Sequence, residues 1–239
     1  MKTLRIIALA ALTAVFSTGL RAQQAVLPFT GTVQYSIAYE SPIIPQEQLA
    51  QQPQIASLRM AADKAVFSMA EQKVLADATT KEVHSLINLS SMGLGKYHMV
   101  ETEAELQQQM QEMQNVKVEE TEETKTIFGY TAKLTKAAYK EGNTSVEMEI
   151  WTVENFCDPF LSRATQGEVP GLKGFPLEYK VKTPDMTVNF TIRKLTNEEV
   201  NPKYFSIPSS YKASTKEQMQ KDIQEFMQSM QNMQGGMGM

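Results

Sequence analysis

The sequence predicts a mainly β protein of the α+β class, built on an antiparallel sheet. Apolar and polar residues alternate with a period of two over most of the chain, which is typical of strands that place one face in a core. Short runs of this kind are separated by turn residues at close spacing, as in an antiparallel meander. Helical spacing is confined to two segments, one near the middle of the chain and one at its C-terminal end.

Residues 1–22 are predicted to be a secretory signal peptide. Lys2 and Arg5 form a short positive segment, Ile6–Phe16 is an apolar run too short to span a bilayer, and Ala22 is a suitable cleavage residue. We therefore expect an exported protein, periplasmic or extracellular, that is not an integral membrane protein. The net charge of −4 argues against a nucleic-acid partner, because such partners select basic surfaces.

Residues 23–213 are expected to form the antiparallel β domain. Val33, Tyr35 and Ile37 share one face of the first strand, and Thr183-Pro184-Asp185 is a turn signal that should join the last two strands as a hairpin. The stretch 155–173 has no clear period and is expected to be a long loop. The segment 117–125 is expected to be an exposed strand or loop. The other predicted strands are 56–60, 64–69, 73–76, 82–89, 96–100, 128–139, 144–153, 177–182 and 186–195.

Two capping boxes predict the helices. Thr102 and Glu105 have the spacing in which the hydroxyl accepts the N3 amide hydrogen bond, so a short helix is expected at about 103–114. Ser214 and Glu217 repeat this spacing ahead of a second helix at 214–234, which is rich in Met and Gln. Residues 235–239 are expected to be disordered. The apolar stripe of the second helix is Met219, Ile223, Phe226, Met227 and Met230.

The residue inventory gives little support for catalysis. Nucleophilic catalysis needs an activated nucleophile with a base in hydrogen-bond reach, and the chain holds only His84, His98 and Cys157 for such roles. The two histidines fall on neighbouring predicted strands, but nothing places Cys157 beside them. Zinc-site spacing and phosphate-binding glycine loops are absent from the sequence. We therefore predict no catalytic residue, no cofactor and no enzyme activity.

Methionine is the most distinctive residue, with 15 in the chain. Met227, Met230 and Met233 recur at i, i+3, so their thioethers share a helix face and offer a candidate site for Cu(I), which prefers soft ligands. The alternative is that methionine is a flexible apolar filler, and this is favoured because the run continues the stripe of Ile223 and Phe226.

Five short motifs are spread over most of the chain after residue 28. They are Phe29-Thr30-Gly31-Thr32-Val33-Gln34-Tyr35, Gly129-Tyr130-Thr131-Ala132, Ile150-Trp151-Thr152, Leu172-Lys173-Gly174-Phe175-Pro176-Leu177-Glu178-Tyr179 and Phe205-Ser206-Ile207-Pro208 with Tyr211. Together they resemble the DUF4412 and GLPGLI-like families of exported Bacteroidetes proteins. The resemblance implies an envelope or extracellular location and a strongly bent antiparallel sheet, similar to the half-barrel of the LolA and LppX lipoprotein carriers, with one or two covering helices. It implies no known activity and brings no catalytic residues.

Three functional hypotheses follow. The leading one, which rests on this resemblance, is a non-enzymatic binder of a lipid or another apolar ligand in a pocket beneath the covering helices. Its candidate lining residues are Trp151, Met219, Ile223 and Phe226. Trp151 shares the charged face of its predicted strand, so it either lines a groove or packs at the rim of the core. The second hypothesis is the Cu(I) site, and the third is a structural module whose C-terminal helix docks on a partner protein.

Overall fold

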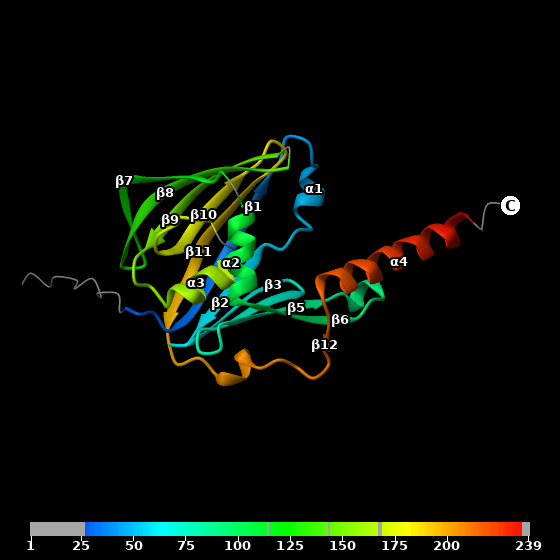
Figure 1. Ribbon diagram of the computed structural model, residues 1–239. Coiled ribbons are helices and arrows are strands. Elements are labelled where there is room, and N and C mark those ends of the chain that lie inside the picture. Colours follow the sequence, from blue (N-terminus) through cyan, green and yellow to red (C-terminus); the bar gives the residue numbers. More distant parts are fainter. Residues whose placement is uncertain (1–26, 114, 143, 167–168, 236–239) are drawn as a thin grey trace, which may run out of the picture.

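The computed structural model describes residues 27–113, 115–142, 144–166 and 169–235 (Figure 1). Its strands form one large, open and strongly curved sheet in the order β12-β6-β5-β4-β3-β2-β1-β11-β10-β9-β8-β7. All neighbours pair antiparallel except β12 and β6, which are parallel. The mainly β, antiparallel prediction is therefore confirmed.

The strands are β1 (Gly31–Glu40), β2 (Ile55–Met60), β3 (Lys64–Met69), β4 (Gln72–Asp77), β5 (Glu82–Asn88), β6 (Lys96–Thr102), β7 (Lys117–Ile127), β8 (Tyr130–Glu141), β9 (Thr144–Val153), β10 (Phe175–Lys182), β11 (Thr187–Asn197) and β12 (Lys212–Ala213). The helices that the structure describes are α1 (Gln46–Leu49), α2 (Glu103–Glu112), α3 (Pro159–Gln166) and α4 (Lys216–Gly235), with 3₁₀ turns η1 (Ser90–Met92) and η2 (Pro202–Phe205).

Strand β1 lies in the middle of the sheet and shows the alternation most clearly. Val33, Tyr35 and Ile37 are buried, whereas the residues between them face solvent. The predicted hairpin of the last two long strands is also confirmed, since β10 and β11 pair with Tyr179 opposite Phe190 and Lys182 opposite Thr187. One hydrophobic core connects the two halves of the sheet. Its large buried side chains include Leu58, Met60, Phe156, Phe175 and Leu177.

The predicted strand 128–139 begins two residues late because its first residues form a turn. Ile127 pairs with Tyr130, and Phe128 and Gly129 between them both have positive φ, 48° and 85°. Two consecutive residues of this conformation make the tight turn that suits the twist of a β-hairpin. Phe128 is therefore half-exposed at a hairpin tip rather than packed in the sheet.

Helix α3 covers the concave side of the sheet and contacts β3, β4 and β10 (Figure 1). It lies inside the stretch 155–173, which was expected to be a loop, so that expectation was wrong for residues 159–166. The helix is short and begins at Pro159, and Asp158 accepts a 2.7 Å hydrogen bond from the Phe160 amide. Phe160 and Leu161 are buried, so burial of these two side chains stabilises a helix too short to be stable alone.

The opposite face of β2–β6 is crossed by the segment 198–211, which contains η2 and leads into β12 (Figure 1). The Arg59 guanidinium of β2 lies 4.1 Å from the Tyr204 ring centroid on this segment. Val66 and Leu75 pair across β3 and β4 on the same face as Arg59, and both are buried. The sheet is therefore packed on both faces in this half.

The exposed edge strand at one end of the sheet is β7, which confirms the prediction of an exposed segment at 117–125. Glu119, Glu120, Glu122 and Glu123 give this edge a dense negative charge. Charged side chains on an edge strand discourage pairing with another chain. At the other end, β12 has only two residues, so it offers little free edge.

Both predicted helices are present. The capping box of α2 is confirmed, because the Thr102 hydroxyl accepts from the Glu105 amide at 3.4 Å and the Thr102 amide donates to the Glu105 carboxylate at 2.7 Å. The cap of α4 lies one residue later than predicted: the Thr215 hydroxyl, not that of Ser214, accepts from the Gln218 amide. Ser214 instead donates its amide to the His98 carbonyl and so extends the ladder of β12.

Helix α4 begins at β12 and extends away from the sheet (Figure 1). It is attached near its start by a 2.6 Å ion pair between Lys216 and Glu101 and by a 3.0 Å hydrogen bond from the Tyr97 hydroxyl to Asp222. The Phe226 ring packs over Gly93, the residue that follows η1. Residues 1–22 and 236–239, which carry the predicted signal peptide and most of the predicted disordered tail, lie outside the described residues.

Candidate functional site

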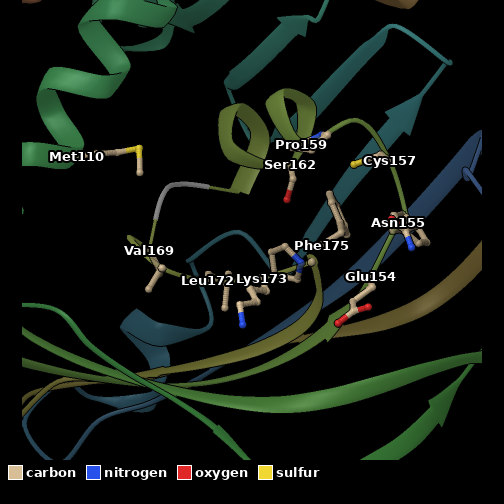
Figure 2. Close-up of a pocket in the computed structure, with 14 residues that line it drawn as sticks. Met110, Glu154, Asn155, Cys157, Pro159, Ser162, Val169, Leu172, Lys173 and Phe175 are labelled. Carbon is tan, nitrogen blue, oxygen red and sulfur yellow. The ribbon is translucent and has the colours of Figure 1, made fainter.

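A cavity of about 570 Å³ opens on the concave side of the sheet, between α2, α3 and the segment that leads into β10. Figure 2 shows Met110 reaching toward it from α2, with Val169, Leu172 and Phe175 along the opposite wall. Pro159 and Ser162 of α3 form a third side. The walls are therefore mainly apolar and come from three elements that are distant in sequence.

Close backbone packing fixes the wall formed by the segment before β10. Gly174 has φ 77°, and a Cβ atom at this position would lie 2.9 Å from the Val153 carbonyl oxygen of β9. A glycine is therefore needed for the chain to pass so close to β9. Next to it, the Phe175 ring stacks on Phe156 with centroids 4.7 Å apart, and Phe156 stacks on Phe29 at 4.9 Å.

The polar rim of the cavity is formed by Glu154, Asn155 and Lys173. The Lys173 ammonium lies 2.7 Å from Glu120 of β7, and Lys133 lies 3.4 Å from the same carboxylate. These two cations hold the pKa of Glu120 below its usual value, while the hydrogen bond to Glu120 raises the pKa of Lys173. Lys173 is mostly exposed, so its ammonium is a positive charge at the mouth of an apolar cavity.

Cys157 also lines the cavity but is not activated. Burial, together with the nearby charge of Asp158, raises the pKa of the thiol to about 12. The thiolate is the nucleophilic form, so this side chain is protonated and unreactive at neutral pH. His84 and His98 lie on β5 and β6 and do not line this cavity.

Trp151, a predicted lining residue, lies elsewhere. It is half-buried on β9, where the Lys125 ammonium sits 4.4 Å from the centre of its ring. Lys125 is in turn bound to Glu178 of β10 at 2.6 Å. Trp151 therefore packs at the rim of the core against a salt bridge, on the face of β9 opposite to buried Ile150, and it is not among the residues that line the cavity.

The predicted lining residues of the C-terminal helix, Met219, Ile223 and Phe226, are half-buried on α4. This helix is attached to β6 and β12, and seven strands separate β6 from the β9 strand of Trp151. The structure therefore does not bring Trp151 together with the α4 residues.

The predicted metal ligands also lie on α4. Met227 and Met230 are 53% and 41% exposed, and the side chain of Met233 lies outside the described residues. In the part of the chain that the structure describes, no three His, Cys, Asp or Glu side chains gather in a way that could hold a metal ion.

The cavity residues Met110, Leu172 and Phe175 were missed by the sequence argument. Met110 falls inside the helix predicted at about 103–114, and the segment 172–179 was noted as a motif, but neither observation revealed a common site. Both signals are local, whereas the cavity exists only because α2 and α3 are brought together over the sheet.

Comparison with known proteins gives no family assignment. No family model matches the chain, and no curated protein matches it. Two solved structures of PNGF-II, in the C2 and P2₁ space groups, are similar at 12% and 13% identity with TM-scores of 0.48 and 0.47. Each match covers 82% of this chain but only 33% of the PNGF-II chain. No helix in the described residues is long and apolar enough to cross a membrane.

Proposed function

We propose that this chain is an exported, non-enzymatic binding protein that takes up a lipid or another apolar ligand in the cavity beneath α3. The observation that carries the proposal is the mainly apolar lining of a cavity of about 570 Å³. Cavities that hold small ligands have volumes of roughly 300–1,000 Å³, with apolar walls and a few polar groups. The resemblance to exported envelope proteins with a strongly bent sheet supports the same proposal.

The chemistry of the walls suggests how the ligand would lie. Leu172 and Phe175 offer a rigid apolar surface, whereas Met110 is unbranched and adapts to different shapes at little cost. Lys173 at the mouth would attract an anionic end group, in exchange for part of its interaction with Glu120. A single-chain amphiphile with an acidic head, such as a fatty acid, meets both requirements.

Binding of a fluorescent fatty acid tests the proposal. We expect the variant Leu172→Glu to bind at least about tenfold more weakly, because burial of one leucine contributes roughly 1.5–3 kcal/mol and a buried carboxylate would be unpaired. The matched control is Ile43→Glu, which changes an apolar side chain that is 66% exposed and does not line the cavity. Equal affinity of both variants and the unchanged protein, with intact circular dichroism, would contradict the proposed site.

Native mass spectrometry of protein purified from its own envelope would identify the natural ligand.

The exposed thioethers of α4 favour a second candidate function, binding of Cu(I). Met227 and Met230 are on one helix face and turn substantial area to solvent, although they continue an apolar stripe. Replacing both by Leu should keep the apolar surface and remove the soft ligands, so affinity for Cu(I) against a chelator should fall while fatty-acid binding stays the same. Met92→Leu is the control, because Met92 is 47% exposed and belongs to η1. Unchanged Cu(I) affinity in the double variant would exclude this site.

A further inference from the structure

The two histidines of the chain form a pair on the sheet. His84 of β5 and His98 of β6 approach through Nδ1 and Nε2, which are 3.1 Å apart. Their rings are tilted by 36° with centroids 5.3 Å apart. The sequence placed them only on neighbouring strands, whereas the register aligns them as diagonal neighbours, with His84 opposite Val100 and His98 opposite Leu86. They lie on the face crossed by residues 198–211, away from the proposed apolar cavity.

The surroundings of the pair indicate which ring nitrogens carry protons. The side chain of His84 is 14% exposed, and the Glu82 carboxylate lies 3.7 Å from its Nε2 atom. That distance is too long for a hydrogen bond, but the negative charge favours a proton on Nε2 and so leaves the Nδ1 lone pair directed at His98. Burial and then the neighbouring His84 lower the pKa of His98, which favours the neutral form of this ring.

We propose that His84 and His98 bind one divalent transition-metal ion of the Zn²⁺, Cu²⁺ or Ni²⁺ class. Imidazole nitrogen is a preferred ligand of these ions. A Zn²⁺ ion 2.0–2.1 Å from two nitrogens in tetrahedral geometry would hold them about 3.3 Å apart, close to the distance between these atoms. Each ring would stay neutral and carry its proton on the nitrogen that faces away from the ion. For His98 this means that the proton moves from Nε2, through which the ring would donate to His84 Nδ1, to its own Nδ1. Water would complete the coordination.

Glu82 would act as a positioning residue for this site. Metal-bound histidines commonly interact through their second nitrogen with a carboxylate, which fixes the tautomer and raises the basicity of the ligand. Glu82 is adjacent to that nitrogen of His84. Two cations on the same face, Lys73 of β4 and Lys96 of β6, would repel a bound metal ion. The Lys96 ammonium is directed toward the Tyr211 ring, 5.8 Å from its centroid.

Metal titration of the full chain tests the pair. Zn²⁺ in isothermal titration calorimetry should bind with a stoichiometry of one, and binding should weaken steeply below about pH 6 as protons compete for the imidazoles. His84→Gln and His98→Gln should each lower the affinity by more than about tenfold, and Glu82→Gln by a smaller factor. Zn²⁺ separates this site from the methionines of α4, because thioethers favour softer ions. Fatty-acid binding should be unchanged in all three variants.

Electron paramagnetic resonance with Cu²⁺ gives a readout that a purely structural role would not change. The spectrum should show two coordinated imidazole nitrogens in the unchanged protein and one in each single variant. The assignment is direct because the chain has no other histidine. If a variant does not fold, the spectrum of the unchanged protein still decides the question. The proposal is wrong if that spectrum lacks two imidazole nitrogens, or if His84→Gln/His98→Gln binds Zn²⁺ as tightly as the unchanged protein.

Discussion

Gly31, at the start of the central strand β1, has no room for a side chain. Its φ is 145°, and a Cβ atom there would lie 2.0 Å from the Thr196 carbonyl oxygen of β11 and 3.0 Å from the Phe29 ring. The β1–β11 contact would have to open to accept even a methyl group. We expect Gly31→Ala to lower the free energy of unfolding by about 3 kcal/mol or more in chemical denaturation.

The control for this prediction is Gly142→Ala. Gly142 also has positive φ, 59°, but a Cβ atom there would meet nothing within 4 Å. The free energy of unfolding of this variant should fall by only about 1 kcal/mol, because of backbone strain. Equal losses for both alanine variants would mean that the clash with β11 is relieved without cost.

His98 should make the stability of the protein depend on pH. Its pKa is lowered in the folded state, mainly by burial and then by His84, from the ordinary value of 6.5. The unfolded chain therefore binds the proton more readily, and the stability contribution that is complete above about pH 6.5 is lost as the pH falls through the folded-state pKa. The stability difference between the unchanged protein and His98→Gln should shrink from pH 7.5 to pH 5.5 in metal-free urea titrations. A constant difference over this range would contradict the assignment.

At the scale of elements, the β10–β11 hairpin depends on its register. Tyr179 of β10 lies opposite Phe190 of β11, and their rings stack with centroids 4.4 Å apart. Insertion of one alanine after Val188 would turn either Val188 or the Phe190–Ile192 set to the wrong face. We expect the free energy of unfolding to fall by several kcal/mol, which should appear as a strongly lowered melting temperature. The same insertion between Pro184 and Asp185, in the turn, should cost much less, and equal melting temperatures for the two insertions would refute the register argument.

Helix α4 should be separable from the sheet. Its attachments, from Lys216, Asp222 and Phe226, lie in its first eleven residues, and the following Met227 and Met230 are exposed. Deletion of residues 216–239 should therefore leave a cooperatively folded β domain with increased binding of a hydrophobic dye, because Tyr97 and the η1 turn lose their cover. Circular dichroism should show the loss of helix with retained strand signal. A truncated chain without a cooperative transition would place α4 in the core.

At the scale of the whole molecule, the function proposed here requires export. The predicted signal peptide ends at Ala22, and the described structure begins later, at Leu27. We expect N-terminal sequencing of the protein isolated from its own cells to start at or near Gln23, in the soluble envelope fraction or the medium. Protein that begins at Met1 and sediments with membranes would contradict this expectation. Lys2→Glu with Arg5→Glu should retain the precursor in the cytoplasm.

Whole-molecule shape also explains why the cavity exists. An open, strongly curved sheet encloses a concave side that it cannot fill with its own side chains, so α2 and α3 complete the core there (Figure 1). The gap between these helices and the segment before β10 is the proposed ligand site. On the opposite face, η2 packs on β3, and Tyr204 and Tyr211 of the segment 198–211 lie against Arg59 of β2 and Lys96 of β6.

Features that depend on neighbouring residues could be predicted from the amino-acid pattern alone. Alternation at Val33, Tyr35 and Ile37 specified which face of β1 is buried, and the turn at Pro184 specified the last hairpin. Thr102 and Glu105 specified where α2 begins. These signals are readable because a strand buries every second residue, and because a cap needs a particular side chain three residues before the amide that it binds.

The way in which distant segments meet could not be predicted from these local patterns. Helix α3 is a helix because Phe160 and Leu161 find a concave surface to bury against, and eight residues carry too little periodicity to predict it. The cavity, and the 3.1 Å approach of His84 to His98, follow from the curvature and register of twelve strands. Long-range pairing is decided by the packing free energy of the whole sheet, to which each local pattern contributes only a small part.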